Sequence, residues 1–188
     1  MKTGVARRPI VDMDAYELSL KSRMDPTQSI LRSLNARARA NQSTLVFAEG
    51  DDPRVLRAAV LYQRSGMGKA LIVGRDDDVK EKLTAEGLAE AFDELEIINA
   101  ATTPHLDTYK DFLYKRLQRK GFDAQDVHRL AARDRHVFAS LMLAHGHADG
   151  MVTGATRKSA HILELINYVF DAEPVSYTHL TLPTILLV

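Results

Sequence analysis

Three short apolar segments that alternate with longer amphipathic ones constrain the fold of this chain most. The apolar segments STLVFAEG, KALIVG and ELEIINA occupy residues 43–50, 69–74 and 94–100, and they are rich in branched side chains, as buried strands are. The segments between them, residues 51–66 and 75–88, have the length and polar pattern of helices. Because strand and helix alternate, the sequence predicts a parallel sheet with right-handed crossovers, which is an α/β fold.

The capping residues of the first of these helices support its assignment. Asp52 suits the N-cap position and Pro53 the first helical position, while Gly66 and Gly68 are placed to end the helix. The helical spacing puts four side chains on one face, which is expected to pack on the sheet: Val55, Ala58, Ala59 and Tyr62.

The rest of the chain is predicted to be mostly helical. Before the first strand, residues 13–24 and 25–41 are expected to form two helices, the second with Asp25 as N-cap and Pro26 as its first helical residue. After the third strand, the expected helices cover residues 104–121, 123–134, 135–148 and 156–174, with stops at Gly121 and Pro174, and a short strand lies in residues 149–155.

Composition and charge argue against several classes of function. The 188 residues carry 25 Lys+Arg and 25 Asp+Glu, so neither a nucleic acid nor a membrane-surface partner is expected. Cysteine is absent, which excludes a disulfide framework, a thiolate metal site and a cysteine nucleophile. The first residues lack the apolar region of a signal peptide, and no stretch reaches the roughly 18 apolar residues of a spanning helix. A cytoplasmic protein is therefore expected.

Two common cofactor motifs are missing from the sequence. No Gly-x-Gly-x-x-Gly fingerprint is present, and SGMGKA (residues 65–70) lacks the Gly-Lys-Ser/Thr ending of a P-loop, so no nicotinamide cofactor is expected to bind here. His145 and His147 could share a metal ion, but no further ligands cluster with them in the sequence. The helix dipole explains histidines at a helix end, and we expect no metal site.

The candidate site residues follow two predicted strands. Glu49 closes the first strand, where we expect it either to accept hydrogen bonds at a cleft wall or to be a solvated acid beside a turn glycine. Thr153, Gly154, Thr156 and Arg157 follow the segment DGMV, at the expected start of a helix. Unpaired backbone N–H groups there would suit a phosphate or carboxylate, and Arg157 would add charge. The alternative is ordinary N-capping by Thr153 or Thr156, with Arg157 on the surface.

Several segments resemble one enzyme family. LVFAEGDDPRVLRAAV followed by GKALIVGRDDDVKEKL resembles the opening of the phosphotransacetylase (phosphate acetyl/butyryl transferase) family, and HADGMVTGATRKSAHIL resembles a later segment of it. GVARRPIVDMDAYELSLKSRMDPT is similar to the linker after the catalytic part of the large hybrid NADP-dependent malic enzymes of bacteria. The segment from Tyr109 to Ala160 is similar to their phosphotransacetylase-like C-terminal part. The resemblance covers Gly4 to about Pro174.

This resemblance implies a three-layer α/β/α domain with a parallel sheet, the first part of an isocitrate-dehydrogenase-like phosphotransacetylase fold. It implies acetyl-CoA as the ligand, with the phosphates of coenzyme A or acetyl phosphate at Thr153, Gly154, Thr156 and Arg157, and Glu49 at the cleft wall. In the hybrids, a malic enzyme portion oxidises malate with NADP and Mg²⁺ or Mn²⁺, whereas the transferase-like portion is associated with acetyl-CoA sensing and assembly of a homo-oligomer.

The same resemblance implies a domain layout. Residues 1–40 would be a linker with helices, residues 41–174 the N-terminal part of the phosphotransacetylase-like domain, and residues 175–188 a non-native tail. The family places its main catalytic Ser, Arg and Asp residues in a later half, so catalytic residues are unassigned here. Two alternatives stay open: a phosphate acetyltransferase that moves acetyl between coenzyme A and phosphate, and an α/β domain used only for subunit contacts.

The final residues differ in character from the rest. No charged side chain follows Glu173, and the chain closes on TILLV. The composition suits a strand, with Pro183 as an obstacle, and the segment is too short to span a membrane. VSYTHLTLPT can also be back-translated to a transposase adapter sequence, and we therefore expect residues 175–188 to be non-native.

Overall fold

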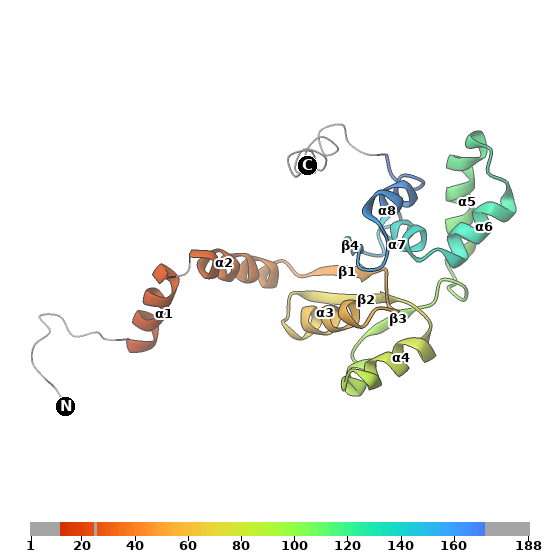
Figure 1. Cartoon of the computed structure of the whole chain (residues 1–188). Coiled ribbons are helices and arrows are strands. Elements are labelled where there is room, and N and C mark those ends of the chain that lie inside the picture. The colour runs from red at the N-terminus through yellow and green to blue at the C-terminus, as the bar shows by residue number, and fades with distance from the viewer. Residues whose placement is uncertain (1–11, 25, 172–188) are drawn as a thin grey trace, which may run out of the picture. The chain divides into compact units, whose positions relative to one another are not determined.

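The structure is a computed structural model that describes residues 12–24 and 26–171, in two units that meet at Asn41 and Gln42. The N-terminal unit consists of helices α1 (Met13–Met24) and α2 (Pro26–Ala40), which confirms both predicted helices (Figure 1). Asp25, the expected N-cap of α2, lies outside the described residues, as does the tail from residue 172 onward.

The second unit contains a four-stranded parallel sheet in the order β3-β2-β1-β4. Its strands are β1 (Ser43–Phe47), β2 (Gly68–Val73), β3 (Glu96–Ile98) and β4 (Gly150–Val152), all within the predicted strand segments except for Gly68. The helices that connect them are α3 (Pro53–Arg64), α4 (Asp76–Ala85), α5 (Leu106–Leu117), α6 (Ala124–Arg133) and α7 (Arg135–Ala144), and α8 (Ser159–Ile166) follows β4. Short 3₁₀ turns η1 (Ala89–Phe92) and η2 (Gln118–Lys120) follow α4 and α5.

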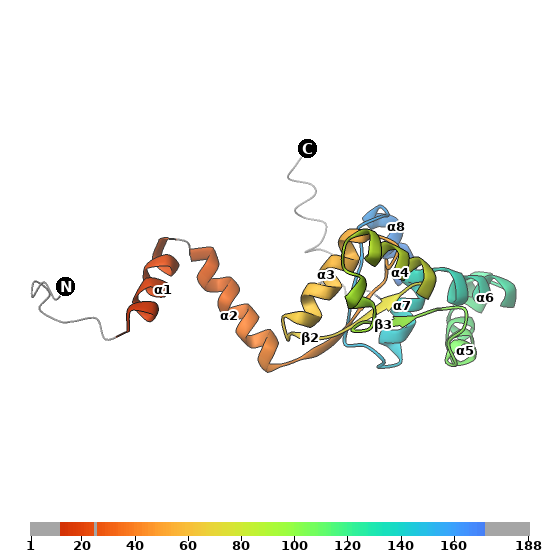
Figure 2. The ribbon, with the colours of Figure 1, turned by 90° about the horizontal axis from the view of Figure 1, so that it is seen from below.

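Two separate cores cover the two faces of this sheet, so the predicted α/β fold is confirmed. On one face, Phe47 and Ile72 pack with buried residues of α3 and α4. On the other, Val46 and Leu71 pack with buried residues of α5, α6, α7 and α8. Neighbouring residues of a strand point to opposite faces, which explains why Val46 and Phe47 belong to different cores. Figure 1 shows α3 and α4 below the strands and α7 and α8 above them, and α5 and α6 lie side by side in both views (Figures 1 and 2).

Helix α3 confirms its predicted cap but not all of its predicted buried face. Asp52 is the N-cap, and its side chain accepts a hydrogen bond from the backbone N–H of Arg54 at 2.8 Å. Ala58 is exposed, whereas the larger side chains of Leu56 and Val60 are buried. Rotating the helix to bury these two side chains removes more apolar surface from water than burying Ala58 would, and this explains the difference.

Two predicted helices end or begin elsewhere than expected. Helix α7 stops at Ala144 because Gly146 turns the chain with a left-handed φ of 72°. Helix α8 spans only Ser159–Ile166 rather than residues 156–174, and Pro174, the expected stop, lies outside the described residues. Its late start follows from a long-range contact, because Glu49, which follows β1, holds Thr156 in a loop.

Gly50 allows the carboxyl ends of β1 and β2 to approach closely. Its backbone N–H donates to Val73 O at 3.2 Å, and a Cβ atom built on Gly50 would lie 2.5 Å from Ile72 Cγ2 and 2.6 Å from Val73 O. Neither neighbour can withdraw easily, since one is buried and the other is backbone.

We therefore predict that Gly50→Ala lowers the free energy of unfolding by about 1–3 kcal/mol, the usual cost of overpacking. Urea denaturation followed by circular dichroism measures the change. Gly74→Ala is the matched comparison, because its Cβ would come within 3 Å of only one atom, the end of the Val79 side chain. Equal losses in the two variants would contradict the steric explanation.

Candidate functional site

The candidate site lies where the order of the strands reverses. The chain builds β1, β2 and β3 towards one edge of the sheet and then returns to place β4 on the other side of β1. In open parallel sheets, ligands collect in the crevice beyond the carboxyl ends of the strands at such a reversal. The residues that follow β1 and β4, residues 48–52 and 153–157, meet at this place.

Glu49 is fully buried and is enclosed by the loop after β4. Its carboxylate accepts hydrogen bonds from the backbone N–H groups of Gly154, Ala155 and Thr156 at 2.9, 2.8 and 2.9 Å, and from the hydroxyl of Thr156. Glu49 is therefore a buried hydrogen-bond acceptor for groups of the chain itself and not a solvated acid, whereas its place at the wall of a ligand cleft stays a prediction. The expectation that these N–H groups are unpaired is wrong, because Glu49 already uses them.

The hydrogen bonds keep Glu49 ionised. Burial alone would raise the pKa of this carboxyl, but the Thr156 hydroxyl and the three backbone N–H groups outweigh it and hold the pKa below its ordinary value. The loop is also held from the opposite side, since Arg54 donates to Ala155 O at 3.0 Å. Glu49 therefore fixes the shape of the loop.

The N-terminus of α7 borders the loops that follow β1 and β4. Asp134 caps this helix by accepting from the backbone N–H groups of His136 and Val137, at 2.9 and 3.2 Å. The other carboxylate oxygen of Asp134 receives Arg157 Nη1 at 2.8 Å. Arg157 is therefore a partly exposed arginine with one acidic partner.

Arg135 and His136 connect α7 to both strand ends. Arg135 pairs with Asp51, which holds the pKa of that carboxyl below its ordinary value, and it also donates to Thr156 Oγ1 at 3.2 Å. His136 Nδ1 is hydrogen-bonded to Thr153 Oγ1 at 2.8 Å, and burial lowers the pKa of the imidazole. Arg135 Nε and His136 Nε2 are buried without a hydrogen-bond partner among the described residues.

The structure thus brings together all five candidate residues of the sequence and adds others. Glu49, Thr153, Gly154, Thr156 and Arg157 lie in one network, although neither threonine caps α8, whose N-cap is Lys158. Further residues of the network were not among the sequence candidates, and those with side chains on or beside α7 or paired with it are Asp51, Asp134, Arg135 and His136. An acid directly before a helix signals a cap and could have identified Asp134, but no local signal connects the other three to the site.

A cavity of about 400 Å³ adjoins this network at the carboxyl ends of β1, β2 and β3. Gly50, Gly74 and Asn99 line it together with three arginines and two aspartates, and these charged residues are Asp51, Arg75, Asp78, Arg133 and Arg135. Arg75 pairs with Asp78 and Arg135 pairs with Asp51, which leaves an excess of one arginine in the lining. This excess suits an anionic group, since guanidinium matches the geometry of phosphate and carboxylate.

The histidines near the end of α7 make hydrogen bonds within the chain. His145 is the C-cap of this helix, and its Nδ1 donates to Leu141 O at 2.8 Å. Within residues 12–24 and 26–171, no three histidine, aspartate or glutamate side chains are placed to hold a metal ion. None of the helices in these ranges combines the length and apolarity needed to cross a lipid bilayer.

Comparison with known proteins identifies related sequences. The family model described as "Phosphate acetyl/butaryl transferase" matches residues 29–179. A protein named NADP-dependent malic enzyme from Rhizobium meliloti is 42% identical over 174 residues, which are 93% of this chain and 23% of that protein. A phosphate acetyltransferase from Thermoanaerobacterium thermosaccharolyticum is 30% identical over 135 residues, covering 72% of this chain and 40% of the relative.

A solved structure supports the same relationship. The crystal structure of a phosphotransacetylase from Streptococcus pyogenes superimposes with a TM-score of 0.65 at 30% identity, covering 76% of this chain and 44% of that one. The chain thus spans about a quarter of the malic enzyme relative and less than half of the transferase relatives.

We predict that Glu49→Gln lowers the free energy of unfolding at pH 7 by about 2–3 kcal/mol, because the amide turns an N–H₂ group towards donors that need an acceptor. The difference from the unchanged protein should depend on pH. The folded pKa of Glu49 lies below the ordinary value of 4.5, so its stabilisation is complete above that value and is lost as the pH falls through the folded pKa.

Urea denaturation of both proteins between pH 7 and pH 3 measures this dependence. Glu81→Gln, on the solvent side of α4, is the control and should leave the stability curve nearly unchanged. A Glu49→Gln deficit that stays constant down to pH 3 would show that the carboxylate charge is not what the loop requires.

Proposed function

Because the chain belongs to the phosphate acetyl/butyryl transferase family, we propose that it is the transferase-like part of a hybrid NADP-dependent malic enzyme, where it senses acetyl-CoA and helps a homo-oligomer to assemble. In this proposal residues 1–40 are the linker, residues 41–174 are the first part of the transferase-like domain, and residues 175–188 are non-native. NADP and Mg²⁺ or Mn²⁺ belong to the malic enzyme portion, and the parent protein acts in the cytoplasm.

The extent of the sequence matches carries this proposal. The family model begins at residue 29, whereas the match to the Rhizobium meliloti malic enzyme leaves at most 14 of the 188 residues uncovered. That match must therefore include most of α1, which the family model lacks. The phosphate acetyltransferases cover only 72% and 74% of the chain. The N-terminal helices thus favour a hybrid malic enzyme over a free-standing transferase.

The proposed ligand site is the crevice between β1 and β4. Thr153, Gly154, Thr156 and Arg157 form its wall, and Glu49 holds this wall in place rather than contacting the ligand, since a carboxylate repels phosphate. Arg157, with its side chain 36% exposed, remains available to a phosphate group of coenzyme A.

A second candidate function is acetyl transfer between coenzyme A and phosphate. The 30% identity with a phosphate acetyltransferase favours it. This activity would require catalytic residues from the part of the family's length that this chain does not span. An open reading frame that continues upstream into malic enzyme sequence would support the hybrid, and a stop codon with a ribosome site before Met1 would support the transferase.

We predict that this chain alone neither oxidises malate nor transfers acetyl groups. We also predict that it binds acetyl-CoA more weakly than a micromolar dissociation constant, because one wall of the site cannot enclose the ligand. Isothermal titration calorimetry measures the binding, and a dissociation constant of about 1 μM, equivalent to about 8 kcal/mol, would overturn the prediction.

In the parent protein, we expect acetyl-CoA to change the rate of malate oxidation and Arg157→Ala to weaken acetyl-CoA binding about tenfold, which is a typical loss for one charge-assisted contact. Arg129→Ala is the matched control, since Arg129 pairs with Asp126 on the surface of α6. The proposal fails if the two variants bind acetyl-CoA equally well and both retain the affinity of the unchanged protein.

A further inference from the structure

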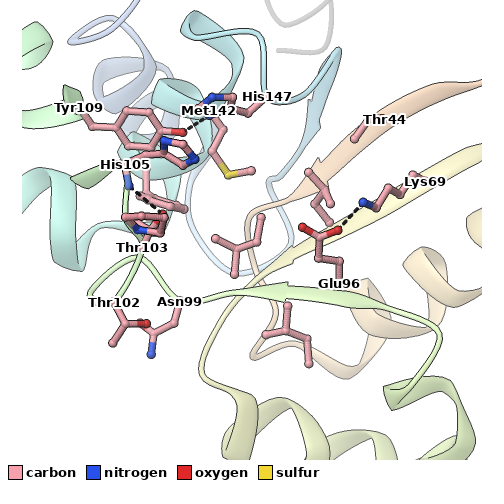
Figure 3. Close-up of a pocket in the computed structure, with 15 residues that line it drawn as sticks. Thr44, Lys69, Glu96, Asn99, Thr102, Thr103, His105, Tyr109, Met142 and His147 are labelled. Carbon is pink, nitrogen blue, oxygen red and sulfur yellow. Dashed lines mark hydrogen bonds and ion pairs between the residues drawn. The ribbon is translucent and has the colours of Figure 1, made fainter. Parts of the chain in front are cut away.

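A second cavity lies on the sheet face that α7 covers only in part. It has a volume of about 570 Å³, which is within the range of small-molecule sites. Most of its apolar residues come from two strands and from α7: Leu71, Ile97, Ile98, Phe138 and Met142. Figure 3 shows Lys69 and Glu96 on one side of the cavity and Tyr109, His105 and His147 on the other. Lys69 and Glu96 form an ion pair, so their charges cancel.

Tyr109 and His147, on the side of the cavity with the three rings, have defined hydrogen-bonding roles. Tyr109 is buried, and burial raises the pKa of its hydroxyl to about 12, so this hydroxyl remains a donor. It contacts His147 Nδ1 at 2.5 Å, which makes Nδ1 the acceptor and places the proton of the neutral imidazole on Nε2. Partial desolvation of the ring and the neighbouring His105 and His145 lower the pKa of His147 and favour this neutral form.

Aromatic surface is exposed beside this donor. The rings of His105 and His147 lie 4.4 Å apart between centroids, and both residues are exposed to solvent. Thr102, Thr103 and Asn99 also line the cavity. Thr103 Oγ1 and Asn99 Oδ1 each accept one backbone N–H, at 3.4 and 3.0 Å, and each oxygen can accept a second hydrogen bond. A flat ring with several nitrogen atoms could stack on an imidazole and exchange hydrogen bonds with these groups.

The two cavities adjoin each other at Asn99. This residue directly follows β3 and lines both the arginine-rich cavity and the cavity with the rings. One cavity therefore offers guanidinium groups for phosphates, and the next offers a ring-lined surface with an apolar floor. A nucleotide carries phosphates at one end and a neutral base at the other, and it therefore matches these two adjoining cavities.

We propose that the cavity with the rings receives the adenine ring of a coenzyme A-type ligand, with at least one of the nucleotide phosphates in the arginine-rich cavity. This inference rests on the proposed function and specifies where the nucleotide part of that ligand lies. Adenine is neutral, presents ring nitrogens to a donor such as His147 Nε2–H, and carries an amino group for the threonine hydroxyls and the Asn99 oxygen.

Both walls of this cavity belong to the chain, so the chain itself is sufficient for the test. The chain is titrated with adenosine 3′,5′-bisphosphate, which carries the phosphate pattern of coenzyme A, and amide chemical shifts are recorded by NMR. Saturable shifts are expected at residues 99, 102–105 and 147 and along residues 74–75 and 133–135. Adenosine 2′,5′-bisphosphate, which carries the pattern of NADP, should bind at least fivefold more weakly.

His105→Ala removes an exposed ring that makes no side-chain hydrogen bond within residues 12–24 and 26–171, so the fold should persist. This substitution should weaken binding at least fivefold. His161→Ala, on the surface of α8, is the matched control and should change affinity less than twofold. The proposal would be overturned if adenosine 3′,5′-bisphosphate caused no saturable shift at these residues, or if the His105→Ala and His161→Ala variants bound it with equal affinity. Tighter binding of the 2′,5′ isomer would also overturn it and would assign the cavity to another nucleotide.

These outcomes are distinct from failure of the proposed function. In the parent protein, an affinity for acetyl-CoA that Arg157→Ala lowers and His105→Ala does not would retain acetyl-CoA sensing and reject the adenine position. A second outcome is also informative. If neither variant changes that affinity in the parent protein, but the isolated chain still binds the 3′,5′-bisphosphate through His105, the proposed acetyl-CoA site at Arg157 fails and the adenine position is retained.

Discussion

The carboxylate of Glu49, enclosed by the loop after β4, is the contact on which the rest of the site depends. A buried carboxylate destabilises a fold unless hydrogen bonds replace the water that it loses. Three backbone N–H groups and one hydroxyl do so here, all from residues that are 105 to 107 positions away in the chain. The contact therefore joins the end of β1 to the loop after β4 and fixes the position of that loop.

The positions of the arginines follow from this contact. With Thr156 held against Glu49, its hydroxyl lies within reach of Arg135, which also pairs with Asp51 beyond β1. The next residue, Arg157, reaches the cap of α7 at Asp134. The anion site that the sequence suggested at the backbone of this loop is thus occupied from within, and the guanidinium groups around it are what remains for an external anion. A structural role for the glutamate and a binding role for the arginines are compatible for this reason.

Local patterns in the sequence predicted the elements, whereas contacts between distant segments determined the site. Alternating apolar and amphipathic segments, together with Asp52 and Gly121 at helix ends, were sufficient for the parallel fold and for most helix positions. The exposure of Ala58 and the late start of α8 could not be read locally, because they depend on which face meets the sheet and on where Thr156 is held. Asp51, Arg135 and His136 could not be predicted from local patterns for the same reason, since each contacts the site only through partners on other elements.

The order of the strands also explains why two cavities of different character lie next to each other. After β3 the chain must cross one face of the sheet to reach the far side of β1, and α5, α6 and α7 make this crossing. Phe138 and Met142 of α7 meet the strands from one side, but Lys69 and Glu96 on β2 and β3 stay exposed, which leaves the ring-lined cavity open. The start of α7 lies beyond the strand ends, where it supplies Arg135 to the other cavity. One crossover therefore produces both a neutral, apolar surface and a cationic one, and Asn99 at the end of β3 borders both.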